Sequence, residues 1–291
     1  MQKIFLISLF LFSPVFLNAQ NAILVKDRVP VQNDTISKQD PKRYGPDDNL
    51  DGPGIENKYF AFFIPLMKAS INGDLIGKRK DIQVLSMFKK DTKRHGGADW
   101  GEDIISTKNA FGAGYFGIKI NGKLISPSWK NTENIEIKII SDKADDTAIS
   151  LTFKNWNTGK SKIDVSWTIS TNWEARWIQH KLQFPQGFTE EVQFGITKHL
   201  SEYTFLKDSQ SMFGLGDQTY KNVSPHKLLM AVKADSGNFT DFFTEGKNTG
   251  VRLKLNESAA ATAWTTYSWA AEPAPVFMSE GWEKLLFSGL K

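Results

Sequence analysis

The 291-residue sequence contains no cysteine and only four histidines. The absence of cysteine excludes a disulfide framework, a cysteine nucleophile and a lipid anchor attached through cysteine. The histidines, His95, His180, His199 and His226, lack the spacing of zinc sites, and no HExxH motif occurs. The GxSxG nucleophile elbow and the phosphate-binding loop are also missing. We therefore expect no metal and no other cofactor.

The charge balance is only mildly basic. The chain has 36 Lys and Arg against 32 Asp and Glu, which gives a formal net charge of +4. Such a charge favours an anionic partner. The basic residues form no cluster and no nucleic-acid motif is present, so we expect no nucleic acid. Aromatic residues reach 12% with nine Trp, a content that suits sugar-stacking surfaces as well as a core.

The first residues have the pattern of a secretory signal peptide. Lys3 is followed by an apolar run from Ile4 to Leu17, which is too short to span a membrane, and the small residue Ala19 suits a signal peptidase. We expect cleavage after Ala19, no membrane anchor, and a secreted or periplasmic protein. Residues 20–53 are polar and are expected to form a linker or lead-in, and residues 54–291 a single domain. The oligomeric state stays open.

Alternation with a period of two dominates this domain. In Lys162–Ser170, Ile163, Val165, Trp167 and Ile169 face one way and polar residues the other, which predicts a half-buried strand. The same reasoning predicts strands over 59–67, 82–88, 115–120, 135–140, 147–153, 175–184, 192–197, 228–232 and 251–255. Asn121-Gly122 predicts a tight hairpin and Asn157–Lys160 a second turn.

Only the last segment has helical features, with Ser279 as a candidate N-cap and Trp282, Leu285 and Leu286 on one side. Many short strands without intervening helices predict an all-β fold, a large antiparallel β-sandwich with a short C-terminal helix.

The stretch from Arg94 to Gly114 is the most unusual of the chain. It holds a histidine, three acids, an indole and five glycines, and we interpret it as one surface loop. His95 stands among acidic neighbours and is a candidate for proton transfer. Trp100 is a candidate sugar platform. An ordinary Gly-rich connection with an exposed histidine is the alternative.

Two further histidines each have a functional and a structural interpretation. His180 shares a strand face with Ile178 and Leu182, which favours a buried core histidine, although a cleft wall would let it act together with Arg176. His199 follows a predicted strand end and is a candidate for substrate binding, with a solvated position as the alternative.

Several segments taken together resemble a family of exported proteins with an uncharacterised domain, encoded in bacterial polysaccharide-utilisation loci. They are Gly54–Ala61, Ile82–Lys90, His95–Asp103, Ala110–Gly117 and a closing stretch from Tyr267. The resemblance implies a β-sandwich similar to those of galactose-mutarotase-like and polysaccharide-lyase domains. The family includes the oligosaccharide dehydratase of ulvan degradation. It therefore implies a carbon–oxygen lyase that forms a 4,5-unsaturated uronate at the non-reducing end of an acidic oligosaccharide.

That chemistry needs a group to neutralise the uronate carboxylate, a base for the C5 proton and an acid for the oxygen leaving C4. We expect Arg176 or Lys89 with Asn57 on the carboxylate, His95 or His180 as base, and Tyr115 or Tyr267 as acid. Glu56 and Asp103 are expected to orient these groups or bind hydroxyls.

Two other functions stay open. A carbohydrate-binding protein without catalysis would explain the Trp content. A glycoside hydrolase would need two carboxylates facing one bond, and Glu56 and Asp103 are available.

Overall fold

The computed structural model describes residues 21–26, 29–30, 32–37, 52–66, 71–85, 99–105, 110–198, 204–208, 211–218, 226–276 and 287. The expected signal peptide over 1–19 and the helix expected after Ser279 lie outside these residues. The strands are β1 (Ala22–Lys26), β2 (Val29–Pro30), β3 (Asn33–Ser37), β4 (Gly52–Glu56), β5 (Phe60–Phe63), β6 (Asp74–Lys78), β7 (Gly101–Asp103), β8 (Tyr115–Ile120), β9 (Lys123–Ile125), β10 (Asn134–Lys143), β11 (Asp146–Asn157), β12 (Lys162–Thr171), β13 (Trp177–Gln183), β14 (Glu191–Thr197), β15 (Thr204–Asp208), β16 (Ser211–Gln218), β17 (His226–Ala234), β18 (Phe239–Glu245), β19 (Asn248–Leu253) and β20 (Ala260–Trp269).

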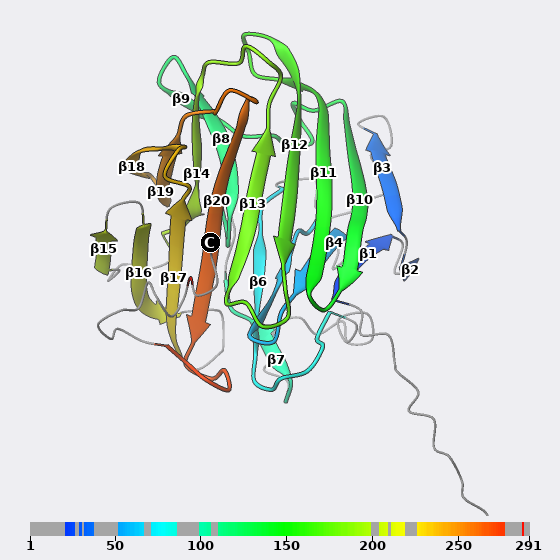
Figure 1. Cartoon of the computed structure of the whole chain (residues 1–291), viewed down its shortest axis with the longest axis vertical. Helices are drawn as coiled ribbons and strands as arrows, with labels where there is room; N and C mark the ends of the chain where they lie inside the picture. Colours follow the sequence, from blue (N-terminus) through cyan, green and yellow to red (C-terminus); the bar gives the residue numbers. More distant parts are fainter. Residues whose placement is uncertain are drawn as a thin grey trace, which may run out of the picture.

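These strands form three antiparallel sheets arranged in two layers (Figure 1). One layer is a nine-stranded sheet with the order β15-β16-β17-β20-β13-β12-β11-β10-β3. The opposite layer combines a six-stranded sheet, β2-β1-β4-β5-β6-β7, with a five-stranded sheet, β18-β19-β14-β8-β9. The first of these packs on β10 to β12 and the second on β16 and β17. The protein is therefore an all-β sandwich, as the alternation predicts, and no helix occurs among the described residues.

The two smaller sheets meet at a pair of glycines. Gly73 and Gly112 form an isolated parallel bridge, and Ala113 N donates to Gly73 O at 2.8 Å. Gly112 and Gly114 have φ angles of 64° and 153°, which favour glycine. This contact joins the residue before β6 in the six-stranded sheet to the segment before β8 in the five-stranded sheet.

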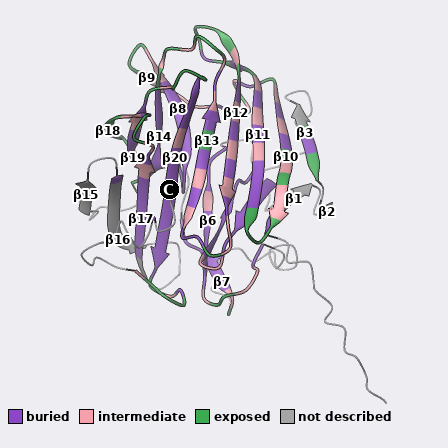
Figure 2. Ribbon diagram, viewed as in Figure 1, coloured by how far each residue is buried: buried purple, intermediate pink, exposed green. Residues whose placement is uncertain are grey.

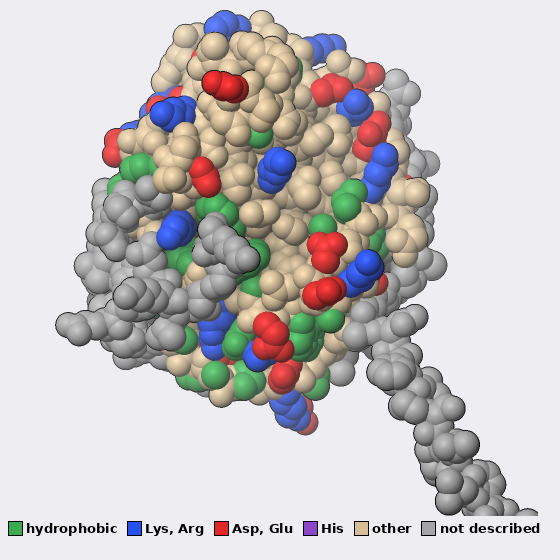
Figure 3. All heavy atoms as spheres, in the orientation of Figure 1, with side chains coloured by type: hydrophobic (Ala, Val, Ile, Leu, Met, Phe, Trp, Pro, Cys, Tyr) green, Lys and Arg blue, Asp and Glu red, His purple; other side chains and the backbone are tan. Residues whose placement is uncertain are grey.

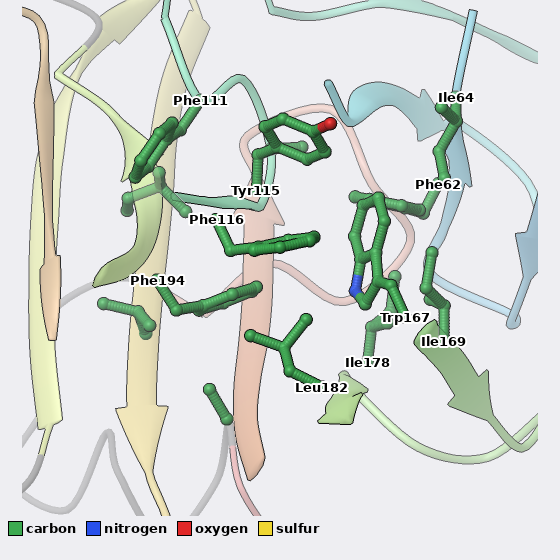
Figure 4. Packing of buried hydrophobic residues seen from close by; sticks show 14 of the residues in the cluster. Phe62, Ile64, Phe111, Tyr115, Phe116, Trp167, Ile169, Ile178, Leu182 and Phe194 are labelled. Atoms are coloured by element: carbon green, nitrogen blue, oxygen red, sulfur yellow. The ribbon is translucent and has the colours of Figure 1, made fainter. Parts of the chain in front are cut away.

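The core lies between the layers and is rich in aromatic rings (Figures 2 and 4). Along β12, Val165, Trp167 and Ile169 are fully buried while the residues between them are half-buried, which confirms the predicted alternation. The ring of Trp167 is central, because it contacts those of Phe116 and Tyr115 at centroid distances of 5.8 and 5.3 Å. Burial of such side chains is the main favourable contribution to folding.

Both predicted turns are present. Asn121 and Gly122 have φ angles of 50° and 75° and connect β8 to β9, as a tight hairpin requires. Gly159, with a φ of 82°, lies in the connection of β11 to β12.

Three expectations are corrected. The lead-in expected before Gly54 contributes strands, because β1 pairs with β4 and β3 pairs with β10. Within the strand expected over 82–88, the described residues 82–85 form no strand; two of their amides bind Glu56 instead of a neighbouring strand. The stretch 94–114 is not one surface loop, since residues 101–105 and 111–114 are buried and Gly101–Asp103 forms β7.

Candidate functional site

One end of the sandwich concentrates charged and aromatic side chains from segments far apart in the sequence. The β4–β5 turn, the ends of β6 and β20, β7 and the β12–β13 connection all meet there, at the lower end of the molecule in Figure 1. We call this set the charged end: Glu56, Asn57, Lys58, Tyr59, Lys78, Arg79, Glu102, Trp173, Glu174, Arg176, Trp269 and Glu272. Figure 3 shows acidic, basic and apolar side chains gathered in this lower region of the visible face.

The innermost part of the charged end is a sealed ion pair. Lys78 Nζ lies 2.6 Å from Glu56 Oε2, and neither side chain is exposed. Glu56 also accepts hydrogen bonds from the amides of Val84 and Leu85, at 2.8 and 3.2 Å. Lys78 Nζ lies 4.6 Å from the centroid of the Trp173 ring. Burial raises the pKa of Glu56 and lowers the pKa of Lys78, each against the attraction of the other. Neither group can meet a substrate.

A second ion pair is almost as deeply buried. Arg176 Nη1 lies 2.6 Å from Glu272 Oε1, and its other terminal nitrogen donates to the carbonyl oxygen of Ala274. Glu272 further accepts a hydrogen bond from Ser268 Oγ at 2.9 Å, and burial raises the pKa of its carboxyl group. The guanidinium carbon of Arg176 is 3.7 Å from the centroid of the Tyr59 ring. Arg176 therefore holds Tyr59 in place, with its terminal nitrogens already bonded within the protein.

Besides Lys58, whose ammonium group pairs with Glu174, Arg79 is an accessible cation of the charged end that the sequence reasoning missed. Its side chain is 31% exposed, and Nη2 lies 3.2 Å from Glu102 Oε1. Its guanidinium stacks over the indole of Trp269, with the central carbon 4.9 Å from the ring. Gly77 allows Trp269 to reach this position, because a Cβ atom there would lie 2.4 Å from the indole. A guanidinium fixed on one side and open on the other can bind a carboxylate.

Five of the residues expected from the sequence lie at or beside this end. Glu56 and Arg176 form the ion pairs described above. Asn57 is fully buried, and its Oδ1 accepts hydrogen bonds from the amides of Tyr59 and Phe60. The carbonyl oxygen of Trp100 accepts from the Arg79 amide at 2.8 Å, and Asp103 is buried on β7. Lys89, His95 and His199 lie outside the described residues.

His180 lies in the middle of the core and not at the charged end. Its Nδ1 accepts from Trp167 Nε1 at 3.3 Å, and its Nε2 lies 2.8 Å from Thr265 Oγ1. The side chain is fully buried, and desolvation lowers its pKa to about 3. His180 is therefore a neutral core histidine, and the structure does not bring it together with Arg176, which has different partners.

The two tyrosines expected as acids are also interior. The hydroxyl of Tyr115 donates to the carbonyl oxygen of Pro127 at 2.8 Å, and burial raises the pKa of the phenol well above its usual value. The hydroxyl of Tyr267 donates to the carbonyl oxygen of Ala113, and its ring packs on Phe60. Neither tyrosine belongs to the charged end.

A pocket of about 250 Å³ opens at the junction of the two smaller sheets. Its polar lining comes from Asn72, Tyr115, Ser126, Ser128 and Asn248. We call it the neutral pocket, because none of the ten described residues that line it is charged. Tyr115 is the one residue expected from the sequence that lines it.

Two features are absent from the described part of the chain. No group of three His, Asp or Glu side chains there is arranged to hold a metal ion. No helix with the length and apolar character of a membrane span occurs there.

The comparisons with known proteins agree with the fold. A family model described as a domain of unknown function (DUF4861) matches residues 18–288. No curated protein matches the chain. Among solved structures, a candidate kojibiose phosphorylase from the human microbiome is similar, with a TM-score of 0.50 and 9% sequence identity. The match covers 92% of this chain but 36% of that protein, so the chain spans about a third of its length. The similarity shows a fold shared with part of a sugar-related protein.

Proposed function

The chain belongs to the DUF4861 family, and from that premise we propose that it is a carbon–oxygen lyase acting on acidic oligosaccharides. The proposed substrate ends in a uronic acid at its non-reducing end, with ulvan-type oligosaccharides as the first candidates. The proposed product is a 4,5-unsaturated uronate. The proposed site is the charged end, in a protein that is secreted or periplasmic.

The observation that carries this proposal is the position of Arg79. Its guanidinium lies over Trp269 and beside Glu102, yet about a third of its side chain is open to solvent. An arginine fixed in this way can form two parallel hydrogen bonds to a uronate carboxylate. The half-buried side chains of Tyr59 and Trp173 lie at the same end and offer ring faces for a sugar.

The elimination moves two protons and two electron pairs, and the pair of the breaking C4–O4 bond leaves with the oxygen. A base takes the proton from C5, and the electrons of that C–H bond form the C4=C5 double bond. The C4–O4 bond breaks, and an acid protonates the departing oxygen. If O4 carries a hydrogen, water leaves and the reaction is a dehydration. The negative charge that develops on the carboxylate is the charge that Arg79 would stabilise.

The roles of acid and base go to two other residues. We propose Tyr59 as the acid, because its ring is held against Arg176 and remains half-buried. We propose His95 as the base. It lies four positions before Asp99 in the sequence, and its own placement is outside the described residues. The two buried ion pairs would position these groups without touching the substrate.

The test measures new ultraviolet absorbance from the conjugated double bond when uronate-ended oligosaccharides are supplied. We expect turnover by the wild type and a fall in kcat of about 100-fold or more for Arg79→Met, as for loss of one donor to a developing anion. Arg79→Lys should retain part of the activity, because it keeps the charge. His95→Ala and Tyr59→Phe should lower kcat with little change in melting temperature.

Arg252→Met is the matched control. Arg252 is 24% exposed and lies within 3.3 Å of Glu191, Asp241 and Glu245, but it belongs to β19 in another sheet. It should keep activity within about twofold if the charged end is the site. Absence of new absorbance across the panel would refute the lyase proposal. Sugar binding without turnover would then favour a non-catalytic carbohydrate-binding protein.

A further inference from the structure

We propose that the neutral pocket is a binding site for one uncharged sugar ring, separate from the charged end. The two regions lie at opposite ends of β6. Asn72 precedes that strand and Arg79 follows it, so about 20 Å of extended chain separates them. The pocket site would therefore be distinct from the proposed lyase site, and its ligand need not be the substrate.

The size of the pocket limits the ligand. Sites for drug-sized molecules usually enclose roughly 300–1,000 Å³. At about 250 Å³, the neutral pocket lies just below this range and fits a single ring better than an oligosaccharide. A longer chain could extend only outward from it.

Two polar side chains of the pocket are ready to bind hydroxyl groups. Asn248 Oδ1 accepts a hydrogen bond from the Phe111 amide at 2.7 Å, which fixes the orientation of the amide group. Among the described residues, the Nδ2 of Asn248 and the Oγ of Ser126 have no hydrogen-bond partner. A fixed amide donor at the start of β19 and a hydroxyl just after β9 can recognise the hydroxyls of a sugar.

The remaining lining supplies apolar contact. Phe111 packs edge-on against Tyr115 and Phe243, with centroid distances of 6.3 and 6.2 Å, so the aromatic wall is rigid. Tyr115 commits its hydroxyl to Pro127, and its phenol stays neutral. None of the described lining residues provides a cation, so among them a uronate would lose the hydration of its carboxylate without compensation. The pocket therefore favours neutral sugars over acidic ones.

The experiment titrates the full protein with methyl glycosides of a neutral hexose, a deoxyhexose and a pentose, and with glucuronic acid. Amide chemical shifts are recorded by NMR. We expect saturable shifts at Phe111, Ser126 and Asn248 with at least one neutral glycoside, and none there with glucuronic acid.

Asn248→Asp is the decisive variant, because it keeps the acceptor for the Phe111 amide and removes the Nδ2 donor. We expect it to weaken neutral-sugar binding at least tenfold. Asn157→Asp is the matched control, since Asn157 Oδ1 accepts the amide of Gly159 in an exposed turn. It should bind like the wild type.

Three results would overturn the proposal: no shift with any neutral glycoside at 50 mM, shifts that cluster away from the pocket, or equal binding by Asn248→Asp. Arg79→Met should leave this binding unchanged. Loss of lyase activity and loss of pocket binding therefore report separately on the two proposals.

Discussion

The charged end and the neutral pocket are built on the same short strand, β6, yet they treat charge in opposite ways. At the charged end, four cations are each paired with a carboxylate, and two of the pairs are almost completely buried. None of the described residues that line the neutral pocket is charged. Tyr115, which lines the pocket, and His180, in the core, are both held neutral by burial.

The two regions differ in whether stability alone explains their side chains. Buried ion pairs contribute little net stability compared with apolar packing, because both ions lose their hydration. The cluster at the charged end is therefore hard to explain by stability alone, which is why we place charge-dependent chemistry there. The neutral pocket needs no functional explanation for its aromatic residues, since their packing continues the hydrophobic core to the surface.

The largest effect is expected from breaking the buried pair. Lys78→Met would leave the Glu56 carboxylate buried without its cation, and we expect a loss of about 3–5 kcal/mol in the free energy of unfolding. The double variant Glu56→Gln with Lys78→Met removes both charges and should recover much of that loss. Urea denaturation of the three proteins measures both. A single variant as stable as the wild type would show that the pair is not sealed.

An intermediate effect on the free energy of unfolding is expected from the protonation of His180 at low pH. The pKa of His180 is about 3 in the folded protein and near 6.5 when unfolded. Between these values the unfolded state binds a proton that the folded state does not. The unfolding free energy should therefore fall as pH decreases below about 6.5, by up to about 1.4 kcal/mol per pH unit.

His180→Gln removes this contribution. Its unfolding free energy should fall less than that of the wild type between pH 6.5 and pH 4.5, as measured by denaturation at each pH. Parallel pH profiles for the two proteins would mean that His180 is not held neutral in the core.

The smallest effect is expected from an exposed ion pair, which serves as the comparison for the buried pair of Glu56 and Lys78. Lys160 Nζ lies 2.5 Å from Glu190 Oε1, a separation like that of the buried pair, but the Lys160 side chain is 67% exposed. Lys160→Ala should change the unfolding free energy by no more than about 0.5 kcal/mol. A loss comparable to that of Lys78→Met would show that separation, and not burial, governs the contribution of these pairs.

The period of two predicted several strands closely. β8 matches the predicted range, and β12 and β14 each differ from it by one residue, although of these only β12 alternates in burial along its length. β6 and β7 were missed. They are short and buried on most positions, so their sequences show no alternation.

The candidate site was only partly predictable. Glu56, Asn57 and Arg176 were selected and do lie at one end of the molecule, but as buried supporting groups. Arg79 was missed because nothing local distinguishes it from other basic residues. Its importance comes from Trp269 and Glu102, which are 190 and 23 positions away in the sequence.

The sequence by itself determined the all-β class, the hairpin at Asn121 and the alternation of the long strands, since each depends on neighbours along the chain. Only the tertiary structure decided which charges are sealed, which arginine is open and where the neutral pocket lies. These properties depend on desolvation and on contacts between strands from different sheets. No local pattern of residues encodes them.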